Sequence, residues 1–223
     1  VDGNLATTRL TVTNGTLAVT LGTTGATISA GANNSATLTL AGTAAQINAA
    51  LATLVYQGTL NFNGSDTLTV LSTDALGATD TDTVAITVTS VNDAPVNTVP
   101  GAQTVAEDTA LVFTGAAAIS VADVDGNLAT TRLTVTNGTL AVTLGTTGAT
   151  ISAGANNSAT LTLAGTAAQI NAALATLVYQ GTLNFNGSDT LTVLSTDALG
   201  ATDTDTVAIT VTSVNDAPVN TVP

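Results

Sequence analysis

Acidic side chains recur in small groups along this chain, and they are the residues best suited to chemistry. These groups include Asp74, Asp93, Glu107 with Asp108, and Asp123 with Asp125. Residues 123–127 read Asp-Val-Asp-Gly-Asn, which places two carboxylates, a flexible glycine and an amide within five positions. Hard cations such as Ca²⁺ take about six to eight oxygen ligands from groups of this kind. The same residue types are ordinary turn formers, so any one group is equally compatible with a loop that binds nothing.

The amino-acid composition excludes most catalytic chemistry. The chain has no His, Cys or Lys, and its only basic residues are Arg9 and Arg132. Without those residue types, a Ser or Thr nucleophile has no base to activate it, and zinc or copper lacks its usual ligands. A pair of carboxylates, as in glycosidases, is the catalytic arrangement that remains. Because the acids are better explained as cation ligands, we predict that the chain is not an enzyme.

The charge of the chain limits its partners. Fifteen acids against two arginines give a net charge of −13. A field of that sign repels nucleic acid and anionic membrane surfaces, and it attracts cations. The sequence also contains no apolar run of the roughly 18 residues that a membrane-spanning helix needs. We therefore expect no nucleic-acid partner and no insertion into a membrane.

The elements that must position the acids belong to a tandem repeat. Residues 1–100 are identical to residues 124–223, and only residues 101–123 occur once. The junction Val-Asn-Asp-Ala-Pro at 91–95 returns at 214–218. We predict a first repeat at 1–93 that lacks its opening strands, a complete second repeat at 94–216, and the start of a third at 217–223. The identity between the two copies favours a long array of repeats. We therefore expect the chain to be part of such an array, with neighbouring identical repeats as its partners.

Alternating polar and apolar residues predict strands through most of each repeat. The clearest are residues 66–72 and 81–89. Asn14-Gly15 separates two further alternating runs, residues 9–13 and 16–21, and this arrangement is typical of a two-residue β-hairpin turn. The spacing of such short strands predicts an all-β fold, with tandem Ig-like or cadherin-like β-sandwiches and one short helix per unit.

The short helix is predicted from a change of period. Thr43 and Gln46 have the spacing of a capping box, and apolar residues follow at intervals of four and three. We predict helices over residues 43–54 and, in the second copy, 166–177. Asp80 and Asp82 alternate along a later strand, where exposed charges are typical of a protected sheet edge. A contribution of this pair to a cation site is the alternative.

The order of the acidic motifs resembles that of cadherin repeats. The chain reads Val-Ala-Glu-Asp-Thr around Glu107, Ala-Asp-Val-Asp-Gly-Asn at 122–127, Leu-Thr-Val-Leu-Ser-Thr-Asp ending at Asp197, and Val-Asn-Asp-Ala-Pro at 214–218. It looks most like the bacterial cadherin-like repeats of large secreted, RTX-type adhesins and surface fibres. One motif of the family, Asp-Arg-Glu before the late strand, is absent. Asn184, Asn186 and Asp189 occupy that neighbourhood.

The resemblance implies calcium ligands at both ends of the complete repeat. Those at the first junction are Asn92, Asp93, Asp123, Asp125, Asn127 and Asp197. Those at the far end are Glu107, Asn215 and Asp216. The first repeat carries Asp2, Asn4 and Asp74. The implied cofactor is Ca²⁺, and a set of oxygen ligands without His or Cys agrees with that ion.

These expectations describe a calcium-stiffened spacer in a long extracellular adhesin or surface filament of a bacterium. In this hypothesis the acids at a junction repel one another without metal and become shared ligands with it. Other copies of the chain in a fibre are a further partner to consider. An alternative is a module that itself binds a glycan or a protein, although two Tyr and three Phe offer few surfaces for a sugar. A carboxylate-pair hydrolase is the third class, and it requires two acids across a cleft without metal.

Overall fold

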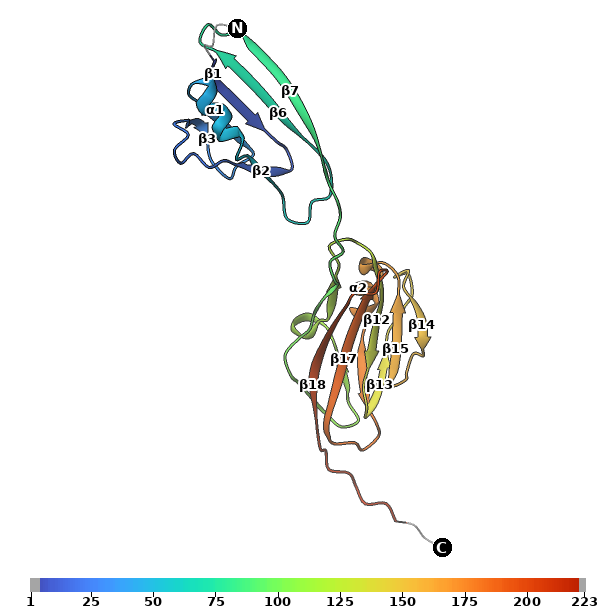
Figure 1. Ribbon diagram of the computed structural model, residues 1–223. Helices are drawn as coiled ribbons and strands as arrows, with labels where there is room; N and C mark the ends of the chain where they lie inside the picture. The colour runs from blue at the N-terminus through green and yellow to red at the C-terminus, as the bar shows by residue number, and fades with distance from the viewer. Residues whose placement is uncertain (1–4, 221–223) are drawn as a thin grey trace. The chain divides into compact units, whose positions relative to one another are not determined.

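The computed structural model describes residues 5–220, in two compact units, 1–91 (unit 1) and 92–223 (unit 2). The described part of each unit is all-β with one short α-helix, as predicted (Figure 1). Asp2 and Asn4 of the predicted site, and residues 221–223 of the predicted third repeat, lie outside the described residues. No helix in the described range has the length and hydropathy to cross a lipid bilayer.

Unit 2 is a sandwich of two layers. Its strands are β8 (Val96–Thr98), β9 (Gln103–Ala106), β10 (Ala110–Val112), β11 (Ser120–Ala122), β12 (Leu128–Thr134), β13 (Gly138–Ala141), β14 (Thr150–Gly154), β15 (Thr160–Ala164), β16 (Val178–Gly181), β17 (Gly187–Asp197) and β18 (Thr202–Thr212). One layer has the order β14-β15-β12-β17-β18-β9, and the other contains β10-β16-β13. The pair β11-β8 forms a separate small sheet. A 3₁₀ turn, η1 (Gly115–Ala117), and the helix α2 (Ala167–Leu174) complete the unit.

The core of unit 2 takes side chains from both layers. Alternate residues of β12, β15, β17 and β18 point inward, and they meet residues of β13 and β16. Tyr179 and Phe113 are the largest side chains that are fully buried. Burial of apolar surface on this scale is the main source of stability for a sandwich of this size.

The described residues of unit 1 repeat the part of this arrangement that runs from β12 to β18 in unit 2. Its elements are β1 (Leu5–Thr11), β2 (Gly15–Ala18), β3 (Thr27–Gly31), β4 (Thr37–Ala41), α1 (Ala44–Leu51), β5 (Val55–Gly58), β6 (Gly64–Asp74) and β7 (Thr79–Val88). One sheet has the order β3-β4-β1-β6-β7, and the other pairs β2 with β5. Its core is correspondingly smaller and centres on the inward residues of β1, β2 and β4.

The capping box forms in both helices. The Thr43 hydroxyl accepts from the Gln46 backbone N–H at 3.4 Å, and the Gln46 side chain accepts from the Thr43 N–H at 2.9 Å. The helix α1 starts directly after this cap, buries Ile47 and Ala50, and ends at Leu51, three residues before the predicted boundary. The same contacts recur in α2. The two predicted helices are therefore confirmed.

The predicted hairpin at Asn14-Gly15 is wrong. Strand β1 pairs with β4 and β6, whereas β2 pairs with β5, so the chain crosses from one layer to the other at this point. Neither Asn14 nor Gly15 has the positive φ of a type I′ turn. The alternation was still informative, because Leu10 and Leu17 are both fully buried. They reach the core from opposite layers.

A buried carboxylate holds this crossing in place. Asp66 accepts hydrogen bonds from Thr13 N at 3.1 Å, Asn14 N at 2.9 Å and the Tyr56 hydroxyl at 3.0 Å. Burial raises the pKa of Asp66, but the hydrogen bonds outweigh it and hold that pKa below its ordinary value. Gly15 is required because a Cβ there would lie 2.5 Å from the Tyr56 ring. The crossing is therefore a tertiary feature and not a local turn.

The same crossing recurs in unit 2 at Asn137-Gly138. Asp189 accepts from Thr136 N at 3.0 Å, Asn137 N at 2.9 Å and the Tyr179 hydroxyl at 3.0 Å. Burial first, and the Asp189 carboxylate second, raise the pKa of Tyr179, which keeps its hydroxyl protonated as a donor. Asp189 thus holds the crossing between the two layers of unit 2 in place.

Candidate functional site

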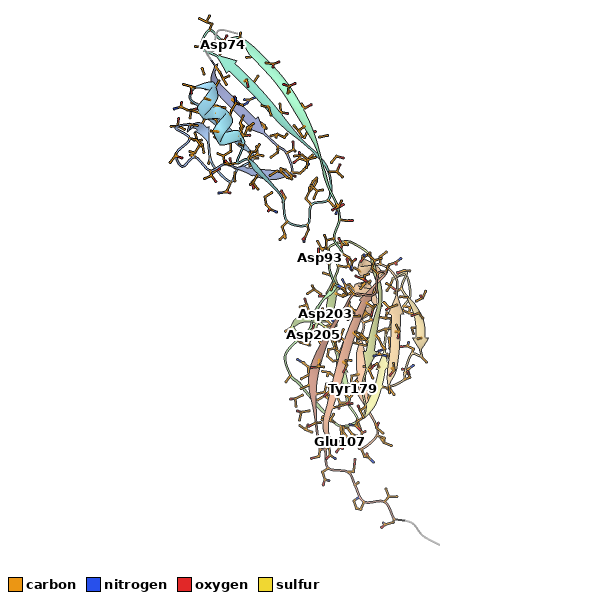
Figure 2. The ribbon with its side chains drawn as sticks, in the orientation of Figure 1. Asp74, Asp93, Glu107, Tyr179, Asp203 and Asp205 are labelled. Carbon is orange, nitrogen blue, oxygen red and sulfur yellow. The ribbon has the colours of Figure 1, made fainter. Side chains whose placement is uncertain are left out.

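The candidate site lies at the end of unit 2 where the chain enters the unit. Three segments meet there: residues 92–95 before β8, the loop 123–127 between β11 and β12, and the loop that follows β17 at Asp197. Figure 2 labels Asp93 at this end of unit 2 and Glu107 at the opposite end. The predicted ligands of the first junction are therefore separated in space from those of the far end.

Asp197 is the buried anchor of this site. Only 3% of the residue is exposed, and its Oδ1 accepts from Leu199 N at 2.9 Å and Ala201 N at 2.8 Å. Its Oδ2 accepts from the Asn92 side-chain amide at 2.7 Å. This amide first, and then the backbone donors, hold the pKa of Asp197 below its ordinary value of 3.8 against the opposite effect of burial. The carboxylate is therefore charged at neutral pH.

The loop 123–127 folds around the carboxylate of Asp123. Its Oδ1 accepts from Asp125 N at 3.0 Å and from Asn127 N at 3.4 Å. Gly126 has φ of +69°, a conformation that a side chain disfavours, so the loop depends on this glycine. The Asp125 Oδ2 in turn accepts from Asp93 N at 2.7 Å. The loop thus fixes the entering chain through side chains that the sequence predicted as ligands.

Two amides connect the carboxylates of Asp197 and Asp123. The Asn92 nitrogen donates to Asp197, and the Asn127 nitrogen donates to Asn92 Oδ1 at 2.8 Å. The Asn127 oxygen then lies 2.9 Å from Asp123 Oδ2, with no hydrogen between them. If the Asn127 amide is turned over, its nitrogen donates to Asp123, but its oxygen faces Asn92 Oδ1 at 2.8 Å. If both amides are turned, the same conflict moves to Asp197.

This series of contacts lacks one hydrogen-bond donor. Two amide nitrogens serve three contacts, and each end of the chain is a carboxylate, so one contact always joins two acceptor oxygens. A cation between oxygens, or a proton on a carboxylate, removes such a conflict. The lowered pKa of Asp197 works against a proton at that position. The amide oxygens of Asn92 and Asn127 beside the carboxylates are a donor set that fits a hard cation.

Carboxylates alone do not make this site. Among residues 5–220, no three acidic, His or Cys side chains come together closely enough to hold a metal ion. A cation at this end would consequently rely on amide and backbone oxygens to complete its ligands. Such mixed sets are typical of Ca²⁺ and unlike the sites of zinc or copper.

The predicted ligands at the far end of unit 2 are only partly brought together. Glu107 is buried, and its side chain accepts from Val214 N at 2.5 Å, one residue before Asn215. Its other oxygen accepts from the Asn186 amide at 3.2 Å. Asn215 and Asp216 are exposed, and the Asn215 amide lies 3.4 Å from the Asp216 carbonyl. Glu107 therefore fastens the departing chain, as Asp197 fastens the entering one.

Asp74 is the described member of the predicted set in unit 1. Its Oδ1 accepts from Leu76 N and Ala78 N, both at 2.8 Å, which repeats the loop contacts of Asp197. The remaining unit 1 candidates, Asp2 and Asn4, lie in the undescribed segment 1–4. The loop closure is thus common to both units, and the contact with Asn92 belongs to unit 2.

Sequence reasoning missed a network of polar side chains that hydrogen-bonds strand β8 to its neighbours. Asn97 is buried; its backbone N–H donates to Asp203 Oδ2 at 2.7 Å, and its side-chain oxygen accepts from the Ser195 hydroxyl at 2.5 Å. Figure 2 shows Asp203 and Asp205 close to each other on β18. Asp203 was expected, as the copy of Asp80, to be an edge charge or a cation ligand. The alternation along the strand could not reveal an acceptor for a strand 106 residues away.

Comparison with protein families gives one match. A family model described as the Protein GAMETE EXPRESSED 2 domain matches residues 10–83 and 116–206, one stretch in each unit and together more than half of the chain. The chain belongs to the GAMETE EXPRESSED 2 domain family. This family differs from the bacterial cadherin-like repeats that the motifs resemble, and the assignment to RTX-type adhesins stays a prediction. The second stretch of the GAMETE EXPRESSED 2 match includes Asp123, Asp125, Asn127 and Asp197, but not Asn92, Asp93 or Glu107.

Several solved structures resemble the chain at low identity and low TM-score, and no curated protein matches the sequence. The fibronectin(III)-like modules of Clostridium thermocellum CbhA are 11% identical with a TM-score of 0.31, over 99% of this chain and 86% of that chain. Cadherin domains 1–5 of protocadherin gamma B2 are 15% identical with a TM-score of 0.38, over 93% of this chain and 34% of that chain. Mouse cadherin-23 EC22-24 is 15% identical with a TM-score of 0.36, over 90% of this chain and 53% of that chain. The chain thus spans about a third to a half of these cadherin structures. At these scores, the assignment of a sandwich rests on the strand pairing and the shared core of each unit.

Proposed function

We propose that the chain is a non-catalytic spacer of an extracellular adhesin or surface filament, stiffened by Ca²⁺ where the chain enters each complete unit. The single observation that carries this proposal is the donor shortage between Asp197 and Asp123. A site that leaves two oxygens facing each other in every amide orientation is better matched to a cation than to a purely structural loop.

The ligands in this proposal join the entering chain to the body of unit 2. Asn92 and Asp93 precede β8, whereas Asp123 and Asn127 lie in the loop between β11 and β12, and Asp197 is the last residue of β17. A Ca²⁺ held by members of both groups would restrain the entering chain, because its release would require loss of the metal. The hydrogen bonds already present would position these oxygens before binding. The strong negative charge of the whole chain would attract the ion.

Calorimetric titration of the full chain with Ca²⁺ tests the metal. We expect saturable binding that Mg²⁺ does not reproduce at the same concentration, because the mixed oxygen ligands suit the larger ion. Asp125→Ala and Asn127→Ala should weaken Ca²⁺ binding by at least about tenfold, that is about 1.4 kcal/mol. Thr83→Ala, at an exposed position of β7 outside the predicted ligand set, is the control and should bind Ca²⁺ as the wild type does. Absence of saturable binding would refute the calcium part of the proposal.

Small-angle scattering with Ca²⁺ and with chelator tests the spacer role. The wild type should change its distribution of interatomic distances on chelation, and Asp125→Ala should resemble the chelated wild type in both buffers. If chelation leaves the wild-type scattering unchanged while Ca²⁺ still binds, the ion has a role other than stiffening. A glycan array on the same protein checks the alternative of a sugar-binding module.

A further inference from the structure

Two Asn-Gly pairs of unit 2 differ in how the fold holds them. Asn137-Gly138 lies at the crossing between the layers, and Asn186-Gly187 lies where β17 begins. An asparagine side chain reacts most readily with the backbone that follows it when the next residue is glycine, because glycine has no Cβ to obstruct the approach. Both pairs have this chemistry, and a hydroxyl residue follows each of them. The fold is therefore what distinguishes their reactivity.

The pair Asn137-Gly138 is fixed on both sides. The Asn137 N–H donates to Asp189 Oδ2 at 2.9 Å, and the Asn137 carbonyl accepts from Thr182 N at 2.9 Å. Gly138 is buried, and a Cβ there would lie 2.5 Å from the Gln180 carbonyl oxygen. The peptide group between Asn137 and Gly138 can therefore rotate only when this part of the unit opens locally.

The pair Asn186-Gly187 is held much less firmly. Both residues are exposed, and Gly187 is the first residue of β17. Its φ of +138° is one that a side chain disfavours, so the position is suited to glycine. The Asn186 amide donates to Glu107 Oε2 at 3.2 Å, at the long end of the range for such a hydrogen bond. The Asn186 side chain can leave this contact and approach the Gly187 nitrogen while the core stays closed.

We propose that Asn186 is a site of spontaneous deamidation, and that the product weakens the hold of Glu107 on the departing chain. The backbone nitrogen of Gly187 gives up its proton and attacks Asn186 Cγ. The new N–Cγ bond forms as the Cγ–Nδ2 bond breaks, and the nitrogen leaves as ammonia with a proton. Water then opens the succinimide ring at either carbonyl carbon, which gives aspartate or isoaspartate. The net reaction consumes water and releases ammonia, so it requires no other reactant.

The reaction changes the surroundings of a buried carboxylate. Glu107 is 5% exposed, and its other oxygen accepts from Val214 N, the contact that fastens the departing chain. A carboxylate at position 186 donates no hydrogen bond and carries the same charge as Glu107. Separation of the two charges requires Glu107 to move away from Val214. Isoaspartate also lengthens the backbone directly before β17, so both products loosen the departing chain.

Mass spectrometry of the aged full chain tests the site. After incubation at mildly alkaline pH, the protein is unfolded and cut with trypsin. Cleavage after Arg132 places Asn186 in the fragment 133–223, apart from its copy Asn63. Tandem fragmentation should show deamidation at Asn186 at least about tenfold faster than at Asn137, because Asn137 must wait for local opening.

Incubation of the same protein in urea is the control. The two deamidation rates should become similar there, because the fold no longer protects Asn137. Absence of deamidation at Asn186 in the folded chain, or equal rates at the two sites, would overturn the assignment. A difference that persists in urea would also overturn it, since the local sequence and not the fold would then select the site. Asn186→Gln, whose longer side chain closes the ring poorly, should leave position 186 unchanged on ageing.

Asn186→Asp tests the consequence, because it places the aspartate product in a chain that has not aged. In chelator, hydrogen exchange at Val214 N should become at least about tenfold faster, and the unfolding transition of unit 2 should move down by roughly 5 °C. Asn157→Asp makes the same chemical change at an exposed residue between β14 and β15, and it should leave both measurements unchanged. If Asn186→Asp also leaves both unchanged, the proposed effect on Glu107 is wrong.

Discussion

Units 1 and 2 have the same sequence over residues 5–91 and 128–214, but unit 2 has the more completely buried core. Tyr179 is fully buried, whereas its copy Tyr56 is half-buried. Leu177 is fully buried and its copy Leu54 is not. The comparison shows that residues 94–123, here called the opening segment, decide how deeply the residues of unit 2 are buried. Burial here depends on the partner segment as much as on the hydrophobic pattern.

Polar contacts divide differently between the two units. Asp66 in unit 1 and Asp189 in unit 2 accept the same backbone N–H groups at nearly the same distances. The crossing between layers is therefore independent of the opening segment. Asp203, by contrast, accepts from Asn97 in β8 of the opening segment. Its copy in unit 1, Asp80, is exposed on β7. These two kinds of contact allow the contribution of the opening segment to be measured separately.

The largest effect should come from removing the anchor of the opening segment. Phe113→Ala should lower the free energy of unfolding of unit 2 by about 3–5 kcal/mol, because it empties a fully buried aromatic site. The transition of unit 1 in the same protein is the internal control and should not move. Scanning calorimetry resolves the two transitions. Equal shifts in both would mean that the units do not unfold independently.

A smaller difference in stability is expected between substitutions of two valines at equivalent positions of the units. Val207→Ala should destabilise unit 2 by about 2 kcal/mol, because the buried side chain loses its contacts and leaves a cavity. Val84→Ala should change the stability of unit 1 by less than about 0.5 kcal/mol, because that side chain is mainly exposed. Urea unfolding of the two variants measures both values. Similar losses in both would show that the face of unit 1 is covered in solution.

The tyrosine hydroxyls provide a still finer comparison. Tyr179→Phe removes a donor from the buried Asp189 and should destabilise unit 2 by about 1–2 kcal/mol. Tyr56→Phe removes the same donor from Asp66 in a more open setting and should have a smaller effect, since water can replace the hydroxyl. Thermal unfolding of the two variants shows which substitution destabilises its unit more. A larger loss for Tyr56→Phe would contradict the difference in burial between the units.

The smallest expected effect is on acid stability. The folded pKa of Asp197 lies below its ordinary value of 3.8, so its contribution is present above that pH and is lost as pH falls through the lowered folded pKa. Asn92→Ala removes the largest cause of this lowering, so unit 2 should begin to unfold at a slightly higher pH. The acid transition of unit 1 should not change. Circular dichroism during acid titration, in chelator, measures the shift.

Much of the fold was predictable because its signals are local. Alternation located β6, β7 and their copies, and the Thr43–Gln46 spacing located the helix. The hairpin at Asn14-Gly15 failed because Asn-Gly is only a preference, and the carboxylate of Asp66, 52 positions away from Asn14, decided the path of the chain. Strand β8 was missed because three residues are too few for a visible period.

The residues of the candidate site were predictable from the sequence, but their hydrogen-bond partners were not. The motifs named Asn92, Asp125 and Asp197, and the structure brings the segments that carry them to one end of unit 2. The contacts that run from Asp197 through two amides to Asp123 could not be foreseen, because they depend on which oxygen each amide faces. Likewise, the contact between Asn186 and Glu107 joins residues 79 positions apart. Their identity as ligands stays a prediction.

The parallel pairing of β9 with β18 has a mechanical consequence. In unit 2, tension enters through residues that precede β8 and leaves after β18, so it pulls these two neighbouring parallel strands in opposite directions along their length. The hydrogen bonds between residues 103–106 and 209–212 then bear the load together in shear instead of breaking one at a time. Under a pulling force, this parallel pairing is therefore the part of unit 2 that resists extension.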